Sequence, residues 1–169
     1  MYVAFGGNVL ISRVMEQEPI INAHNKEEYP PMHTVEHILN QTMIRMFKCP
    51  RSKNVHIERK KSKADYILDS EPTHEQIQAI ENKVNEVIKQ NLPITVEYMS
   101  QAEAASVVDL SKLPENATDT LRIVRIGDYD VCACAGTHVE NTSQIGEFKI
   151  LNCDYEAPRW RMRFKLIEK

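Results

Sequence analysis

Two short segments, far apart in the chain, carry metal-ligand side chains at the same spacing. One is His-Thr-Val-Glu-His at residues 33–37, and the other is Cys-Ala-Gly-Thr-His at residues 134–138. A zinc ion takes about four ligands from cysteine, histidine or carboxylate groups. The two segments could therefore complete one coordination shell, but only in a fold that brings them together.

The first segment is predicted to be helical. Pro30-Pro31 suits the first turn of a helix, and apolar side chains then recur at helical spacing over residues 32–47. Residues four apart on a helix lie on the same face, so His33 and His37 should point the same way. An isolated pair of this kind is also a common polar stripe beside a core, so it indicates a metal site only together with the second segment.

The second segment needs a different backbone. Cys134 lies at the end of a predicted strand, and Gly136 lets the chain turn sharply after it. Such a bend could aim Cys134 and His138 at one point, although alone the pair would be an ordinary buried cysteine and a surface histidine. Cys132 shares a strand face with Cys134 and is an alternative ligand.

The rest of the sequence predicts one α+β domain over residues 1–169, with a mainly antiparallel sheet and helices packed on one side. Thr73 and Gln76 form a capping box that opens the clearest helix. Short turns such as Gly127-Asp128 join several neighbouring strands, which favours antiparallel pairing. We expect helices at 32–47, 73–91 and 101–107, and strands at 1–11, 55–58, 66–68, 94–98, 121–126, 129–134, 147–152 and 161–167.

Composition limits the partners and the cellular setting. The 42% hydrophobic and 27% charged residues are close to globular averages. The net charge of −3 does not attract polyanions to the whole molecule, so DNA binding is not expected and any nucleic-acid contact must come from local basic patches. The apolar start is too short to span a bilayer and lacks a basic leader. We expect a cytoplasmic protein without membrane contact, its four cysteines reduced or metal-bound.

The chain resembles the editing domain of alanyl-tRNA synthetases and of the free-standing AlaX-type proteins, to which a domain of threonyl-tRNA synthetases is related. The pattern of that family is an H-x-x-x-H helix followed by C-x-x-x-H, usually within C-G-G-T-H-V, and both segments above match it. Residues 141–146 stand where the family often has N-T-G-E-I-G, and the predicted helix at 73–91 fits the middle of the family's domain.

The resemblance covers about residues 32–167 and leaves residues 1–31 unmatched. Ala135 and Ser143 depart from the pattern, since each replaces a usual glycine, but neither is a proposed ligand. The resemblance implies an α+β fold like the second additional domain of these synthetases.

The resemblance also implies zinc-dependent hydrolysis of wrongly charged aminoacyl-tRNA. The family removes serine or glycine from alanine tRNA, and its threonine branch removes serine from threonine tRNA. By position, the Zn²⁺ ligands would be His33, His37, Cys134 and His138. Four protein ligands would close the shell, as in structural sites, so catalysis through the metal needs one loose ligand, for which His138 is the candidate. The expected partner is the acceptor end of mischarged tRNA, and the sequence is compatible with a homodimer.

Three residues beside the ligands are candidates for catalysis. Glu36 could act as a general base through water, although its neighbour His37 is a ligand and adjacent helical residues point about 100° apart. A solvated or supporting role is therefore the alternative for Glu36. The hydroxyl of Thr34 or Thr137 could read the hydroxyl of a misplaced serine, because a site built to pair with a hydroxyl rejects an analogue that lacks it.

Two basic runs are candidates for tRNA contact. Alternation along a strand places the three arginines of the second run on one face, while its tryptophan could stack on a base. The alternatives are a solvated hairpin tip for the first run and a charge-protected edge strand for the second. The candidate residues are Arg59, Lys60, Lys61 and Lys63 in the first run and Arg159, Trp160, Arg161 and Arg163 in the second.

Two other functions compete with editing. The first segment also matches H-x-x-E-H, the inverted zincin motif of metallopeptidases, which would need an acidic ligand such as Glu75, Glu81 or Glu86 from the helix at 73–91. That interpretation leaves Cys134 and His138 unexplained. Alternatively, the chain could be a non-catalytic zinc-containing module that binds tRNA or a synthetase, because a fold does not guarantee activity.

Overall fold

The structure is a computed structural model that describes residues 29–111, 113 and 115–168, so the strand predicted at residues 1–11 lies outside the described part. The helices are α1 (Pro30–Phe47), α2 (His74–Lys89), α3 (Gln101–Ala104) and the 3-10 helix η1 (Thr142–Gln144). The strands are β1 (Asn54–His56), β2 (Ser62–Ile67), β3 (Ile94–Ser100), β4 (Thr120–Ile126), β5 (Asp130–Ala133), β6 (Glu147–Glu156) and β7 (Arg159–Ile167).

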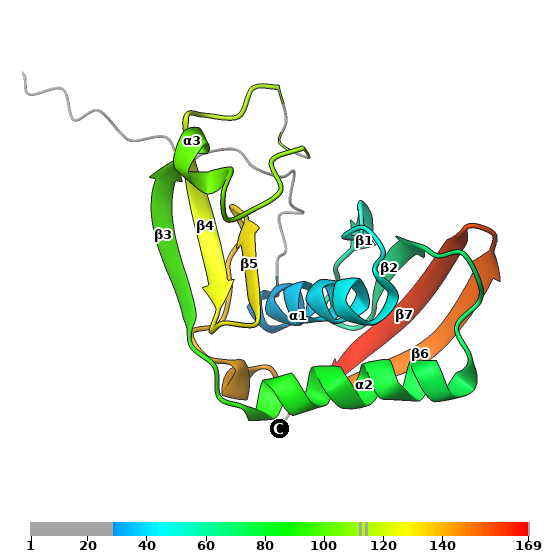
Figure 1. Cartoon of the computed structure of the whole chain (residues 1–169). Coiled ribbons are helices and arrows are strands. Elements are labelled where there is room, and N and C mark those ends of the chain that lie inside the picture. The colour runs from blue at the N-terminus through cyan, green and yellow to red at the C-terminus, as the bar shows by residue number, and fades with distance from the viewer. Residues whose placement is uncertain (1–28, 112, 114, 169) are drawn as a thin grey trace, which may run out of the picture.

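The strands form two antiparallel sheets, and the helix α1 lies between them (Figure 1). The larger sheet has the strand order β1-β2-β7-β6, and the smaller has the order β3-β4-β5. Every described strand pair within the sheets is antiparallel. The predicted α+β class with antiparallel pairing is confirmed, with the strands divided between two sheets.

The helix α2 begins where the sequence predicts, and α1 begins two residues before its predicted start, at the proline pair itself. Prolines occupy the first positions of α1, where a missing N–H costs nothing, and Lys48 ends the helix in the left-handed conformation. The predicted capping box opens α2: the Thr73 hydroxyl accepts from the Gln76 backbone N–H, and the Gln76 side chain accepts from the Thr73 backbone N–H.

The main core lies between the larger sheet and the two long helices. Alternate residues of β7 point into it, and Trp160, Met162 and Phe164 are all fully buried. They pack with apolar side chains of α1 and α2, such as Leu39 and Val84. The helices therefore cover one face of this sheet, as predicted.

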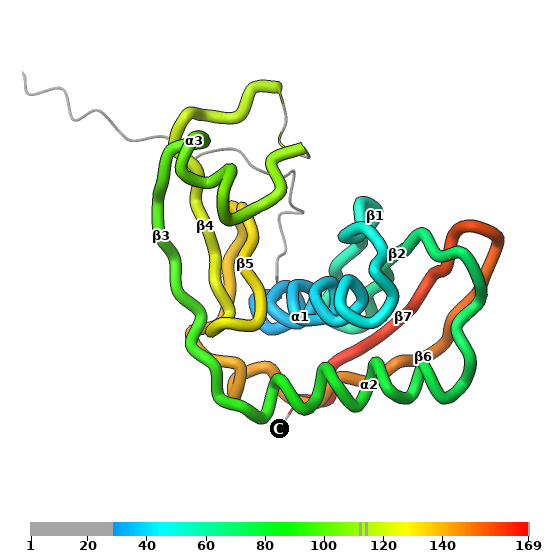
Figure 2. Tube along the Cα trace, in the orientation of Figure 1, coloured from blue at the N-terminus to red at the C-terminus, as the bar shows by residue number. Residues whose placement is uncertain are grey.

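The smaller sheet has its own apolar cluster, formed by Ala104, Leu121 and Ile123. Contacts between α1 and β5 connect this sheet to the main body. The tube in Figure 2 shows β5 beside α1, although the two elements are far apart in the sequence. This junction places the second ligand segment beside the first. Among the described residues, no helix is both long and apolar enough to cross a membrane.

Candidate metal centre

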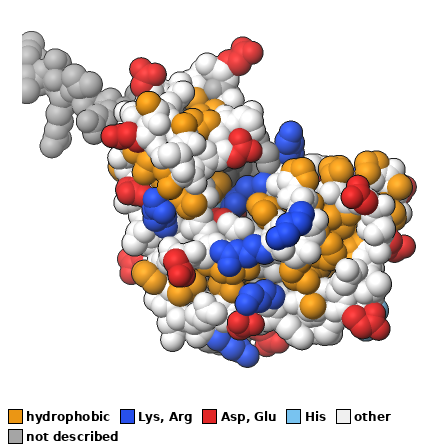
Figure 3. All heavy atoms as spheres, in the orientation of Figure 1, with side chains coloured by type: hydrophobic (Ala, Val, Ile, Leu, Met, Phe, Trp, Pro, Cys, Tyr) orange, Lys and Arg blue, Asp and Glu red, His pale blue; other side chains and the backbone are white. Residues whose placement is uncertain are grey.

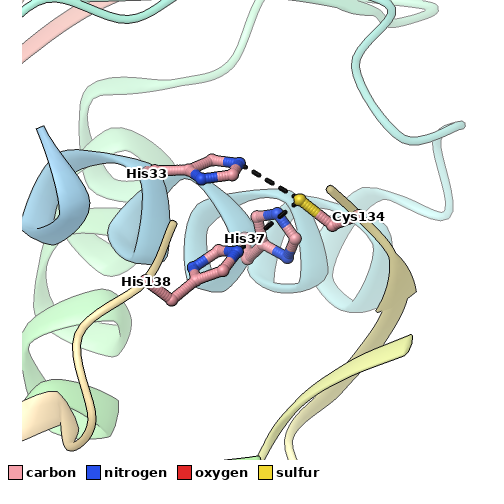
Figure 4. A group of neighbouring side chains, drawn as sticks. All are labelled: His33, His37, Cys134 and His138. Atoms are coloured by element: carbon pink, nitrogen blue, oxygen red, sulfur yellow. Dashed lines mark hydrogen bonds between the residues drawn. The ribbon is translucent and has the colours of Figure 1, made fainter. Parts of the chain in front are cut away.

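The four predicted ligands meet in space. His33 and His37 project from successive turns of α1, while Cys134 follows the end of β5 and His138 lies in the loop beyond it (Figure 4). One potential ligand atom from each residue lies within 4.8 Å of those of the other three. Cys134 Sγ lies 3.4 Å from Nε2 of His33 and 3.6 Å from Nε2 of His138. The prediction that the two segments share one site is confirmed.

Contacts on the outer side of each imidazole direct the inner nitrogen toward the centre. Nδ1 of His33 lies 3.0 Å from the backbone carbonyl oxygen of Thr137, which can only accept, so this nitrogen carries the proton. Nδ1 of His37 makes no hydrogen bond but lies 3.5 Å from Oδ2 of Asp130. These contacts leave Nε2 of both rings available as a metal ligand.

Thr34 orients the imidazole of His138 in the same way, through a contact to its Nδ1. Its hydroxyl donates to the carbonyl of Pro30 at 3.0 Å and accepts from Nδ1 of His138 at 3.0 Å and from the backbone N–H of Val139 at 3.2 Å. A hydroxyl has one donor and two acceptor sites, so all three are used. Thr34 is also completely buried. It therefore has no capacity to read a substrate hydroxyl, in contrast to the role expected from the sequence.

The donor set and the local charge both fit zinc. Three imidazole nitrogens and one thiolate are typical ligands of this ion. Burial lowers the pKa of His138 to about 4, so this imidazole is neutral and free to donate a lone pair. Burial alone would also lower the pKa of His37, but negative charge on Cys134 and Asp130 raises it well above its usual range. Negative charge on Cys134 and Asp130 beside His37 would also attract a metal cation.

A buried ion pair beside His37 was missed by the sequence reasoning. The carboxylate of Asp130 accepts two hydrogen bonds from Arg51, each 2.9 Å long, and one from Gln41 at 3.1 Å. Burial would raise the pKa of Asp130, but Arg51 and His37 hold it well below its usual range. One signal was available, because Asp130 lies four residues before Cys134 in the strand predicted at residues 129–134, which would place both on one face.

Glu36 lies closer to the centre than expected. Its Oε2 is 3.8 Å from Nε2 of His33 and 3.8 Å from Nε2 of His37, and its side chain is 14% exposed. The other oxygen, Oε1, accepts a hydrogen bond from Asn40 at 2.7 Å. Of the two alternatives expected for Glu36, a solvated or a supporting role, this position fits the supporting one, because Asn40, one turn further on, holds the side chain against the helix.

The centre forms part of the floor of a cleft of about 610 Å³ between the two sheets. His33, Glu36 and His37 line this cleft, whereas its described lining includes neither Cys134 nor His138. The walls include residues 49–53 and, from the smaller-sheet side, Val107, Val108, Asp109 and Leu113. Figure 3 shows the surface hollowed here, with Lys and Arg side chains along the border. A substrate would therefore approach the centre from the side of Glu36.

Cys132, the alternative ligand, lies outside the four-residue cluster found among the described residues. Its thiol donates to the carbonyl of Ala133 at 3.3 Å, and burial raises its pKa. The strand ends before Cys134, and the turn at Gly136 directs this second cysteine inward, where the Gly136 N–H donates to its sulfur at 3.4 Å.

The tryptophan of the second basic run does not face solvent. Trp160 is completely buried in the main core, with its ring centroid 6.4 Å from that of Tyr66. The expectation that it stacks on a base is wrong, because the alternation that aligns the arginines on the outer face turns Trp160 toward the helices.

Acidic neighbours partly neutralise the arginines of this run. Arg161 donates two hydrogen bonds to Asp65, of 2.7 and 2.8 Å. Arg159 and Arg163 both bind Asp154, at 3.0 and 2.8 Å. In the first run, Arg59 binds Glu168 at 3.0 Å, while Lys60 and Lys61 are exposed.

Comparisons with known proteins support the motif assignment. Residues 121–161, which include Cys134 and His138, match the family described as the threonyl and alanyl tRNA synthetase second additional domain. The chain is also 30% identical over 136 residues to an alanine–tRNA ligase of Pseudoalteromonas translucida. Over 134 residues it is 30% identical to the alanyl-tRNA editing protein AlaX-L of Pyrococcus horikoshii. The chain is related to the alanyl-tRNA synthetase editing domain.

The relationship covers most of this chain but only part of each relative. The aligned region is 80% of this chain and 16% of the Pseudoalteromonas ligase, and 79% of this chain and 32% of AlaX-L. An alanine–tRNA ligase of a Thermoanaerobacter species is 41% identical over 80 residues, which is 47% of this chain and 9% of that ligase.

The editing-domain relationship and the geometry together disfavour a metallopeptidase. That alternative needs an acidic ligand from α2, but the described cluster is completed by Cys134 and His138. Glu81 of α2 instead binds Lys149 at 2.9 Å and the backbone N–H of Ile150 at 2.8 Å.

Proposed function

We propose that the chain hydrolyses the ester bond of a mischarged aminoacyl-tRNA at a zinc site formed by His33, His37, Cys134 and His138. The observation that carries this proposal is the meeting of these four side chains beside a cleft that His33, His37 and the carboxylate of Glu36 line. A bound zinc ion would supply Lewis-acid polarisation of the ester carbonyl or of water.

Glu36 is the group best placed to move the proton. Water bound at its Oε2 would form a bond to the carbonyl carbon of the ester as Glu36 accepts the water proton. The bond between that carbon and the ribose oxygen then breaks, and the ribose oxygen takes the proton from Glu36. The products are a free amino acid and uncharged tRNA. The cleft walls would hold the terminal ribose in line with this carboxylate.

The substrate class follows from the relatives. Since they include alanine–tRNA ligases and an alanyl-tRNA editing protein, we infer that serine or glycine on alanine tRNA is the substrate. With the Thr34 hydroxyl fully engaged, Thr137 remains the candidate that reads the serine hydroxyl, because its side chain is exposed beside the ligands.

The tRNA would contact exposed cations more readily than paired ones. Lys60 and Lys61 are exposed, whereas Arg161 would have to give up Asp65 before binding a phosphate. We infer that the first basic run contributes more to tRNA affinity than the arginines of β7, and that this binding weakens with salt.

One observation favours a second candidate function. All four side chains can reach a common ion, and four protein ligands would close the shell as in structural zinc sites. The chain would then be a module that binds tRNA or a synthetase without hydrolysing the ester.

Metal content and deacylation separate the two functions. We expect zinc in the wild type and little in His37→Ala and Cys134→Ala. We further expect the zinc-loaded wild type to release serine or glycine from alanine tRNA faster than serine from threonine tRNA. Glu36→Gln should retain zinc and lose most activity. Zinc in the wild type without deacylation of any of these substrates would select the binding module, and no zinc in a metal-replete wild type would refute both.

A further inference from the structure

A series of buried hydrogen bonds, from Tyr66 through Asn40, ends at the carboxylate of Glu36. The hydroxyl of Tyr66 on β2 donates to Oδ1 of Asn40 at 2.7 Å, and Nδ2 of Asn40 donates to Oε1 of Glu36 at 2.7 Å. Tyr66 and Asn40 are each 1% exposed. These hydrogen bonds therefore run from the larger sheet, along one face of α1, to the cleft.

The chemistry of the three groups determines which atom donates and which accepts in each of these hydrogen bonds. The Glu36 carboxylate can only accept, so the amide of Asn40 must turn its NH₂ group toward it. The amide oxygen then faces Tyr66, whose hydroxyl must donate. Burial and the nearby charge of Glu36 raise the pKa of Tyr66 well above its usual range, so the phenol keeps the proton that it donates.

The two carboxylate oxygens of Glu36 consequently have different neighbours. Oε1 is occupied by the amide of Asn40, and Oε2 is left 3.8 Å from Nε2 of both His33 and His37. A glutamate on a helix surface would otherwise sample several rotamers and would lose conformational entropy when it is fixed. The hydrogen bond from Asn40 fixes the side chain before any ligand arrives.

We propose that Asn40 and Tyr66 are positioning residues that hold the Glu36 carboxylate against the metal centre, with Oε2 directed at the ligand nitrogens and the cleft. The expected effect of these residues on ester hydrolysis rests on the proposed function. Their expected effect on metal binding does not require the chain to hydrolyse an ester. The side-chain hydrogen bonds of Tyr66 and Asn40 lead to Glu36 and not to the four candidate ligands, so both are expected to act through Glu36.

A purely structural role is the rival explanation. Asn40 and Tyr66 are buried, so their replacement would destabilise the protein even if Glu36 were irrelevant. A suitable control is Asn85, a half-buried asparagine of α2 that hydrogen-bonds to the backbone of Phe148, away from the metal centre. Loss of Asn85 should affect stability but leave the surroundings of the metal unchanged.

The test uses the visible absorption spectrum of Co²⁺ in the site, together with zinc affinity. We expect Asn40→Leu to alter the Co²⁺ spectrum in the same way as Glu36→Gln and to weaken zinc binding by about tenfold. Tyr66→Phe, which leaves the Asn40 amide in place, should produce a smaller change in the same direction. Asn85→Leu should retain the wild-type spectrum at a comparable loss of stability.

A double variant tests whether Asn40 acts through Glu36. If it does, Glu36→Gln with Asn40→Leu should have the same spectrum and zinc affinity as Glu36→Gln alone. In deacylation, Asn40→Leu should lower kcat about tenfold or more with KM nearly unchanged. A wild-type spectrum and zinc affinity in Asn40→Leu, or fully additive losses in the double variant, would overturn the proposal. An inactive wild type would refute the proposed function, while the Co²⁺ and zinc measurements would still decide the role of Asn40.

Discussion

Replacing Thr34 with valine separates two roles for this residue. Valine has nearly the same shape as threonine but lacks the hydroxyl, so it fits the buried site while removing all three hydrogen bonds. The structure assigns that hydroxyl to the orientation of His138, whereas the sequence favoured recognition of a serine substrate. The two roles predict losses in different measurements.

The expected magnitude follows from the groups left without a partner. Nδ1 of His138 and the backbone N–H of Val139 would both lose their acceptor. A buried polar group left unpaired costs about 1–3 kcal/mol, so with two such groups we expect the variant to lose about 2–6 kcal/mol in the free energy of unfolding. Loss of the contact that orients a metal-ligating histidine lowers metal affinity by about 10–100-fold, and we expect a value in this range.

The assay combines urea unfolding with a zinc titration against a chromophoric chelator. Thr34→Ser is the matched control, because it keeps the hydroxyl and removes one methyl group, at a cost of about 1 kcal/mol in stability. Its zinc affinity should stay close to that of the wild type. The ratio of serine to glycine release from alanine tRNA should be the same in Thr34→Val as in the wild type.

Unchanged zinc affinity in Thr34→Val would refute the role inferred from the structure. A selective loss of serine release, with zinc affinity intact, would restore the role of substrate reader.

Four further predictions concern the metal, the ion pairs and the core. Treatment with a chelator should lower the melting temperature and abolish deacylation, and zinc should restore both. Arg51→Leu leaves the buried carboxylate of Asp130 without its cation and should cost about 3–5 kcal/mol in urea unfolding. Trp160→Ala should cost about 3–5 kcal/mol by the same measurement, whereas a base-stacking tryptophan would alter tRNA affinity instead. Hydrogen bonds from Arg161 lower the pKa of Asp65, so the stability from this pair is present above the unfolded pKa of about 4 and is lost as the pH falls through the folded value. The stability difference between wild type and Asp65→Asn should therefore shrink between pH 6 and pH 3.

Local elements were predictable because their signals are local. The capping box at Thr73 marked the start of α2 to the residue, and the proline pair marked the start of α1. Strand ends were less accurate: β6 continues to Glu156, beyond the predicted end at residue 152. A bulge between Ile150 and Asn152 shifts the register there, which interrupts the alternation on which such predictions depend.

The division into two sheets could not be read from the strands themselves. Short turns predict which consecutive strands pair, but β2 pairs with β7, which is nearly a hundred residues away. Such a pairing depends on which apolar faces bury each other, and that is a property of the whole packed chain.

By itself, the sequence identified the four candidate ligand side chains, because residue types and spacings that suit a metal site are present in the linear order. The tertiary structure alone decided the surroundings of those ligands. Asp130 and Arg51 beside His37, Thr34 behind His138, and the inward turn of Trp160 all depend on contacts between elements distant in sequence. The physical reason is that a side chain's type fixes what it can bind, whereas burial and neighbouring elements fix what it does bind.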